Sequence, residues 1–153
     1  MPVAVHHSVI IVDDLDMSLS FYRDGIGLEV LQDRTVEGDW PALFGAPSRT
    51  LRAVFLGDPQ IPDDHAGVLE LNIFEGKVQT RSRSATGPPT GLFLLSFFVD
   101  VESTLGRLAQ LNLGGSPRRV NQPGPDGPIG IATVCDPDGT WVLLTPGSIT
   151  RRM

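Results

Sequence analysis

Two residues of this chain, His7 and Glu70, have side chains that could work together as an acid and a base. His7 opens a run rich in valine and isoleucine, and Glu70 lies between Leu69 and Leu71 in an otherwise apolar segment. Alternate side chains of a strand point to opposite faces, so Glu70 points away from both leucines. On a face in contact with solvent it would have no functional meaning, whereas in a cavity its carboxylate would need a partner. His7 could be that partner, or it could be a histidine that is only hydrogen-bonded inside the fold.

A few other residues could take part in chemistry, and each also has a purely structural interpretation. By strand alternation, His6 should face the opposite side of its strand and be structural or exposed. His65 lies in a polar turn and should be solvated, although it could reach over a cavity mouth and add a ligand. Cys135 is expected to be a small buried hydrophobic residue rather than a nucleophile. Trp40 and Phe44 would either close a cup over a ligand or pin down a long loop.

The chain contains an internal repeat, which predicts two similar supersecondary units. Segments 7–13 and 94–100 are alike, and each runs into a helical pattern that ends at glycines. In the second copy Leu94 stands where the first copy has its histidine. Ser96 and Phe98 should share a face with Leu94 and give the second half an apolar wall.

The first copy is expected to be a module of strand, helix and three strands. An Asp13-Asp14 pair is a plausible helix cap, and glycines near residue 25 provide a stop. The predicted strands cover 3–12, 28–34, 51–56 and 68–74, the helix follows the aspartate pair, and 35–50 and 57–66 are loops.

The second copy repeats this order after a connector rich in Ser, Thr, Gly and Pro. It predicts strands over 92–99, 118–121, 129–135 and 140–144, a helix capped by Asp100, and a Pro/Gly loop over 123–128. The expected organisation is therefore a first βαβββ module over 1–76, a linker over 77–91 and a second module over 92–147, together forming one α+β domain.

Composition restricts the partners of this protein. The 153 residues include no apolar run near the roughly 20 residues that a membrane span needs. A net charge of −6 argues against a nucleic-acid surface and mildly favours cationic or neutral ligands. The lone Cys135 and the lack of a basic-then-apolar start predict a cytoplasmic protein without a signal peptide.

The order of these motifs resembles the vicinal oxygen chelate superfamily, which includes glyoxalase I, bleomycin-resistance proteins, methylmalonyl-CoA epimerase and extradiol dioxygenases. The resemblance runs from His7 to about Thr145. It rests on the opening from His7 through Phe21-Tyr22 with Asp13, Ser18 and the Gly27-Leu28 stop, on Val68-Leu69-Glu70-Leu71, and on the Asp136-Pro137-Asp138-Gly139 turn. It implies two tandem βαβββ modules that form cup-shaped mixed sheets.

The resemblance also implies where a metal ion would bind. Metal-dependent relatives take one ligand from each of four strands, and these positions carry over to His7, Glu70, Leu94 and Leu143. Alkyl groups cannot coordinate a cation, and transition metals such as Zn, Ni, Fe or Mn ordinarily need at least three protein ligands. We therefore expect an incomplete site that holds a divalent metal weakly if it binds one.

Two functions of different classes remain compatible with the sequence, which leaves open whether the protein is an enzyme. The favoured one is a binder of an aromatic or amphipathic metabolite or drug in an apolar cup, lined by Trp40, Phe44, Leu94, Ser96, Phe98 and Leu143. The alternative is a lyase, isomerase or dioxygenase that uses His7 and Glu70 as ligands or as acid and base. A relative whose cup has lost its ligand is a third possibility. A homodimer that binds a small molecule, without nucleic acid or membrane, is expected.

Overall fold

The computed structural model describes residues 5–61, 67–78, 88 and 90–147. The chain divides into two compact units, one of Met1–Arg23 with Leu28–Ser82 and one of Asp24–Gly27 with Arg83–Met153. His65 and most of the expected linker lie outside the described residues. Within the described part, no helix is long and apolar enough to cross a membrane.

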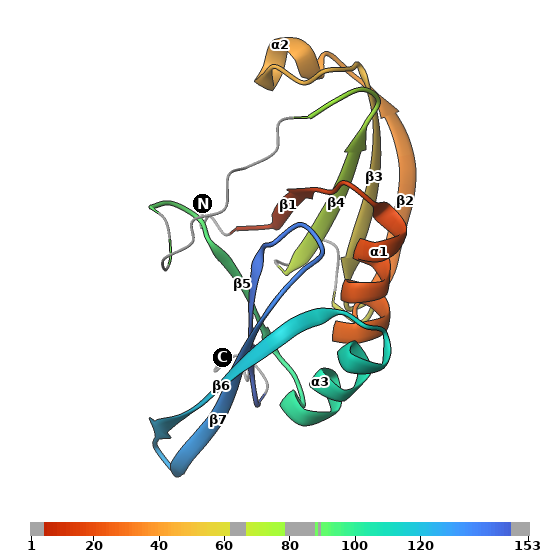
Figure 1. Ribbon diagram of the computed structural model, residues 1–153. Coiled ribbons are helices and arrows are strands. Elements are labelled where there is room, and N and C mark those ends of the chain that lie inside the picture. The colour runs from red at the N-terminus through yellow and green to blue at the C-terminus, as the bar shows by residue number, and fades with distance from the viewer. Residues whose placement is uncertain (1–4, 62–66, 79–87, 89, 148–153) are drawn as a thin grey trace. The chain divides into compact units, whose positions relative to one another are not determined.

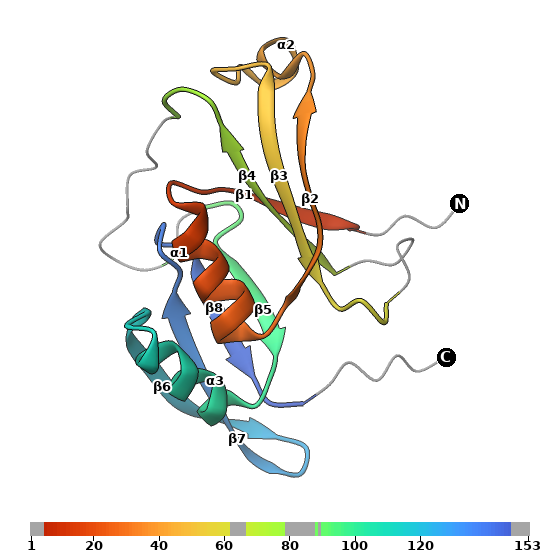
Figure 2. The same ribbon diagram turned by 90° about the vertical axis from the view of Figure 1, so that its right-hand side faces the viewer.

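The first unit contains a four-stranded mixed sheet in the order β1-β4-β3-β2, in which only β1 and β4 are parallel (Figures 1 and 2). Its elements are β1 (His7–Ile11), α1 (Leu15–Leu19), β2 (Glu29–Glu37), α2 (Trp40–Phe44), β3 (Thr50–Gly57) and β4 (Val68–Phe74). A π-helical segment (Ser20–Ile26) continues α1, and its last three residues belong to the second unit.

The second unit repeats this topology in the order β5-β8-β7-β6, with β5 parallel to β8. Its elements are β5 (Leu94–Phe98), α3 (Val101–Gln110), β6 (Gly114–Gly124), β7 (Gly127–Cys135) and β8 (Trp141–Thr145). The expected α+β fold of two tandem βαβββ modules with mixed sheets is therefore confirmed.

Helices α1 and α3 each begin at an aspartate that satisfies a free backbone N–H group of the first turn. Asp14 accepts a hydrogen bond from Met17 N, and Asp100 accepts one from Ser103 N at 2.9 Å. The hydrogen bonds from the backbone and side chain of Ser103 lower the pKa of Asp100 below its usual value.

One face of each sheet forms a core with the helix of its own unit. In the first unit α1 contacts β4, and the fully buried side chains include Phe21, Tyr22, Leu56 and Leu71. Burial of each such side chain stabilises the fold by about 1.5–3 kcal/mol. In the second unit α3 contacts β6 and β7, and a Cβ added to Gly114 would lie 3.5 Å from Val134 and 3.6 Å from Leu108.

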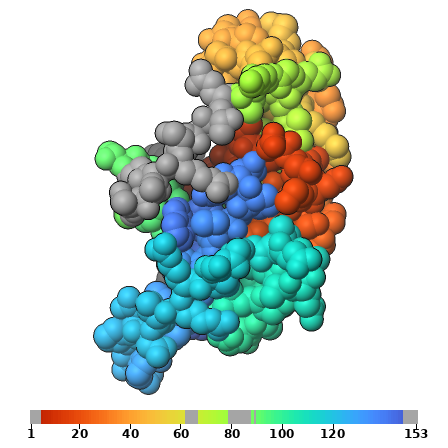
Figure 3. All heavy atoms as spheres, in the orientation of Figure 1, coloured from red at the N-terminus to blue at the C-terminus, as the bar shows by residue number. Residues whose placement is uncertain are grey.

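Two segments that we expected to be loops contain regular structure. The loop predicted over 35–50 includes the end of β2 and the short helix α2, which lies at the surface of the first unit (Figure 3). Asp39 caps α2, and Gly45 ends it with a left-handed backbone at φ 69°. The Pro/Gly loop predicted over 123–128 is largely paired in β6 and β7. Pro123 is tolerated because β6 is an edge strand, and Pro128 is tolerated because β7 pairs with β8 only from Ala132 to Cys135.

Candidate functional site

The structure brings His7 and Glu70 together on one face of the first sheet. β1 and β4 are parallel, with His7 opposite Val68 and Val9 opposite Glu70. Across this register His7 Nε2 lies 3.4 Å from Glu70 Oε2. The glutamate side chain is only 11% exposed, whereas the histidine is 42% exposed. A nearly buried carboxylate therefore has an imidazole beside it that remains open to solvent.

His6 extends this pair to three groups, which the sequence did not predict. His6 Nδ1 lies 3.0 Å from His7 Nδ1, and the two rings meet edge to face. In this hydrogen bond one Nδ1 donates and the other accepts, so the tautomers of the two rings are complementary. His6 is exposed, as expected. The expectation that it faces away from its neighbour is wrong, because β1 begins at His7 and strand alternation does not reach back to His6.

The pairing of the strands defines which residues share a face with this pair. We call the face that carries His7 and Glu70 the first open face. By register, one row of this face holds Val9, Glu70, Phe55 and Gln32, and the next row holds Ile11, Asn72, Ala53 and Arg34. Val9 and Ile11 are each 47% exposed, and Glu70 and Asn72 are buried. Half of these eight residues are apolar, and the other half place polar groups at defined positions.

Asn72 and Arg34 are two polar residues of this face that we did not predict. Among the described residues, the buried Asn72 Oδ1 has no hydrogen-bond partner. Arg34 places its guanidinium carbon 5.6 Å from the centroid of the Phe55 ring. Asn72 is two positions beyond Glu70, so strand alternation could have identified it. The stacking of Arg34 depends on the pairing of β2 with β3, which the sequence does not reveal.

Trp40 and Phe44 lie on α2, between the end of β2 and the start of β3. Their rings are stacked with centroids 5.9 Å apart, and Phe44 also meets Phe74 edge to face. Trp40 packs against the buried cluster of Leu51, Ala53 and Phe74. Phe44 remains 56% exposed.

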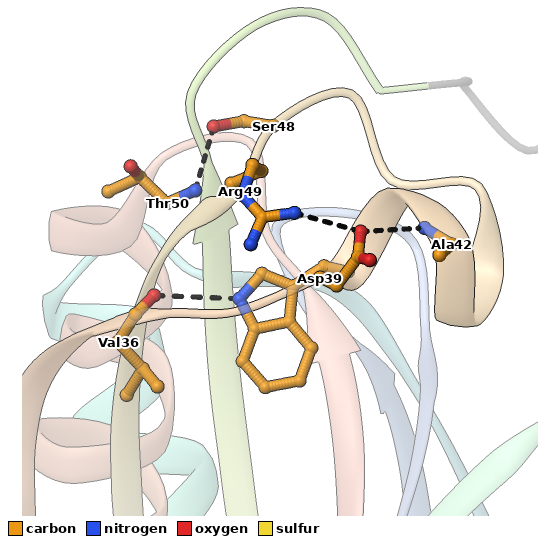
Figure 4. Close-up of polar contacts among 7 residues, drawn as sticks. Val36, Asp39, Ala42, Ser48, Arg49 and Thr50 are labelled. Atoms are coloured by element: carbon orange, nitrogen blue, oxygen red, sulfur yellow. Dashed lines mark hydrogen bonds and ion pairs between the residues drawn. The ribbon is translucent and has the colours of Figure 1, made fainter.

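Polar contacts hold α2 in place (Figure 4). The Asp39 carboxylate accepts a hydrogen bond from Ala42 N and pairs with Arg49 at 3.0 Å. The Trp40 indole N–H donates to Val36 O at 3.5 Å. The helix is therefore attached to β2 and to the segment that leads into β3.

The second sheet has apolar residues at the positions equivalent to His7 and Glu70. Leu94 pairs with Trp141 and Ser96 with Leu143, so Leu143 stands two residues beyond the partner of Leu94. Glu70 has the same relation to His7 in the first sheet. Ser96, Phe98 and Leu143 share this second open face with Leu94, and each is at least partly exposed.

The donor set at these four positions does not fit a metal centre with four protein ligands. The first sheet offers an imidazole and a carboxylate, and the second offers two alkyl groups. In the described ranges, no group of three or more His, Cys, Asp and Glu side chains lies close enough to hold a metal ion.

On the opposite, helix-side face of the first sheet an arginine is neutralised by a carboxylate. Arg52 donates to Asp33 through Nε at 3.1 Å and Nη2 at 2.8 Å. This hydrogen-bonded guanidinium lowers the pKa of Asp33, and the carboxylate raises the pKa of Arg52. In the second sheet Arg119 forms an ion pair with Glu102 of α3.

Comparisons with known proteins agree with this architecture. Residues 4–144 match the family model of the glyoxalase/bleomycin resistance protein/dioxygenase superfamily. The chain is 38% identical over 145 residues to the lactoylglutathione lyase-like protein terB of Aspergillus terreus, which covers 92% of this chain and 74% of that protein.

Solved structures show the same likeness. The trypanothione-dependent glyoxalase I of Leishmania major is similar with a TM-score of 0.61 and 25% identity, over 95% of this chain and 87% of that one. A glyoxalase family protein from Bacillus cereus shares the fold with a TM-score of 0.71 and 22% identity, over 96% of this chain and 97% of that one. From its motifs, its repeated sheets and these matches, the chain belongs to the glyoxalase/bleomycin resistance protein/dioxygenase superfamily.

Proposed function

We propose that this protein binds a small aromatic or amphipathic molecule on its first open face, anchored by His7 and Glu70, without a complete four-ligand metal centre. The observation that carries the proposal is the contrast between the two sheets. One holds a histidine 3.4 Å from a glutamate, and the other holds leucines in the same register. Without a complete metal centre, both polar groups would be available to bond to a ligand directly.

The remainder of the first open face suits an apolar ligand. Val9 and Ile11 are each 47% exposed, and Phe55 is partly exposed beside Glu70. Binding sites for small molecules typically combine such apolar surface with a few placed polar groups. Trp40 and Phe44 of α2 extend the aromatic surface of this unit.

A second candidate is a lyase or isomerase that moves a proton without the usual metal. His7 is open to solvent on one side and contacts a nearly buried carboxylate on the other, which suits a general base held in place by Glu70. His6 at 3.0 Å could accept or return the proton. The name of the Aspergillus terreus relative, a lactoylglutathione lyase-like protein, supports this candidate as well.

We also propose that two copies associate. β1 and β5 are edge strands of their sheets, and they expose Val9 and Ile11 at 47% each and Phe98 at 49%. Apolar residues on open edges favour pairing with another chain. Light scattering should then give a mass of twice the 16.5 kDa chain.

The binding proposal is tested by a thermal-shift screen of aromatic and amphipathic compounds in the presence of a chelator. We expect a subset to raise the melting temperature of the wild type and to lose this effect in His7→Ala and Glu70→Gln. Glu29→Gln is the matched control, because it removes an exposed carboxylate from β2 of the same sheet. Stabilisation that requires an added divalent metal would contradict the proposal.

Exchange of carbon-bound hydrogen separates the two candidates. If the protein is a proton-transfer enzyme, lactoylglutathione in heavy water should exchange the hydrogen next to its carbonyl group, as followed by NMR. His7→Ala should abolish that exchange and Glu29→Gln should retain it. Binding without exchange supports the binder.

A further inference from the structure

Each open face carries one arginine that is stacked on an aromatic ring. In the first sheet the guanidinium carbon of Arg34 lies 5.6 Å from the centre of the Phe55 ring. In the second, that of Arg118 lies 5.1 Å from the centre of the Trp141 ring. By register, Arg34 shares a face with Glu70, and Arg118 shares one with Leu143. The same combination thus appears twice in the repeat.

The arginines of the opposite faces form ion pairs, whereas Arg34 and Arg118 of the open faces form none with the residues that the structure describes. On the helix side, Arg52 pairs with Asp33 and Arg119 pairs with Glu102. Among the described residues, Arg34 has no carboxylate partner. Its guanidinium contacts the Phe55 ring instead. This occurs in a chain with 18 acidic and 12 basic residues, where carboxylates are plentiful.

Stacking leaves the hydrogen-bonding capacity of Arg34 intact. The ring offers no conventional hydrogen-bond acceptor, so the five N–H donors of the planar guanidinium remain available to a ligand. The contact also restricts the long side chain, so less conformational entropy is lost when an anion binds. A planar carboxylate can accept two of these hydrogen bonds at once.

Phe55 separates this cation from the acid/base pair. Phe55 pairs with Glu70 across β3 and β4, and Arg34 lies on β2, one strand further. Arg34 pairs with Ala53, in the row next to that of Glu70, so two strand spacings across the sheet and two residues along it, about 12 Å in all, separate the backbones of Glu70 and Arg34. A bicyclic aromatic molecule has about the length needed to reach from one group to the other. The buried Asn72 Oδ1, which has no hydrogen-bond partner among the described residues, lies in the same row as Arg34.

We propose that Arg34 binds an anionic group of the ligand, so that the ligand class of the first open face is the aromatic carboxylates. This proposal rests on the proposed function and names the chemistry of its ligand. It departs from the net charge of the whole chain, which by itself favours neutral or cationic ligands. The charge preference of the ligand depends on the groups that contact it, so the nearby Arg34 outweighs the net charge of the whole chain.

The test compares 1-naphthoate with 1-naphthamide, which have similar shapes and differ in charge, by calorimetric titration of the full chain. We expect the wild type to prefer the carboxylate. Arg34→Gln should lower the affinity for 1-naphthoate about ten-fold, which corresponds to about 1.4 kcal/mol, and leave 1-naphthamide unchanged. Arg34→Lys, which keeps the charge but loses the planar fork, should give an intermediate loss.

Arg52→Gln is the matched control, since it removes the same charge from the other face of the same sheet. It should leave both affinities as in the wild type. Equal affinity of the wild type for the two probes would overturn the role of Arg34 and leave the binding function standing. An equal loss of affinity for 1-naphthoate in Arg34→Gln and Arg52→Gln would do the same. Failure of both probes to bind at their solubility limits would count against the aromatic carboxylate class and against the proposed function together.

Discussion

At the scale of residues, the contact between His7 and Glu70 links stability to chemistry. The Glu70 side chain is 11% exposed, and its nearest described ionisable partner is His7 at 3.4 Å. A buried polar group that loses its partner costs more than the hydrogen bond itself contributes. The residues proposed to bind a ligand therefore also affect the folding of the sheet, and variants of them need a stability measurement beside every binding measurement.

The repeat supplies a direct test of this link. We expect His7→Ala to lower the free energy of unfolding by about 1 kcal/mol, because it leaves the Glu70 carboxylate without its imidazole. The double variant His7→Leu/Glu70→Leu copies the residues of the second sheet, Leu94 and Leu143. It should recover most of that loss, since replacing both partners by apolar groups is close to neutral.

Urea unfolding measures both variants. A His7→Ala protein as stable as the wild type, or a double variant less stable than His7→Ala, would show that the contact does not support the sheet.

The sequence identifies some site residues but not others. Strand alternation places Glu70 opposite to the core leucines, and the internal repeat pairs His7 with Leu94. The contact of His6 depends on where β1 begins, and the stacking of Arg34 depends on which strands are neighbours. Both are tertiary facts, so local patterns do not contain them.

At the scale of elements, the helices and most strands follow from local signals, and the differences have identifiable causes. The aspartate caps predict where α1 and α3 begin, and the alternating apolar residues predict β4 over 68–74. The glycines and prolines over 35–50 and 123–128 predicted loops, whereas these segments contain a helix and paired strands. In α2 they start and end a helix, and in β6 proline is accepted because that strand is at an edge.

The cap of α3 gives a prediction with a defined pH dependence. The pKa of Asp100 is lowered in the folded protein, so the ionised cap contributes stability above the usual aspartate pKa of about 4. That contribution is lost as the pH falls through the lowered, folded-state value. Asp100→Ala should therefore reduce the urea midpoint near neutral pH, and the difference from the wild type should shrink with acidification.

Asp100→Asn is the matched control, because asparagine also caps helices but carries no charge. It should lie between the wild type and Asp100→Ala near neutral pH. An Asp100→Ala protein that matches the wild type at every pH would contradict the role of this cap.

At the scale of the whole molecule, one topology is used twice with different chemistry. Both sheets have the same strand order and the same parallel pair, yet only the first keeps a histidine and a glutamate at the key positions. Membership of the superfamily determines the scaffold, and the side chains on the open faces determine what it does. We propose that here they favour direct binding of a ligand over coordination of a shared metal ion.

The most direct test of this account is the metal content of the wild-type protein, purified without an affinity tag and measured by elemental analysis beside His7→Ala. Two protein ligands form an open and weak site, so we predict far less than one transition metal per chain in both proteins. Close to one metal ion per chain in the wild type, lost in His7→Ala, would contradict the account and would place a metal-dependent reaction at this site.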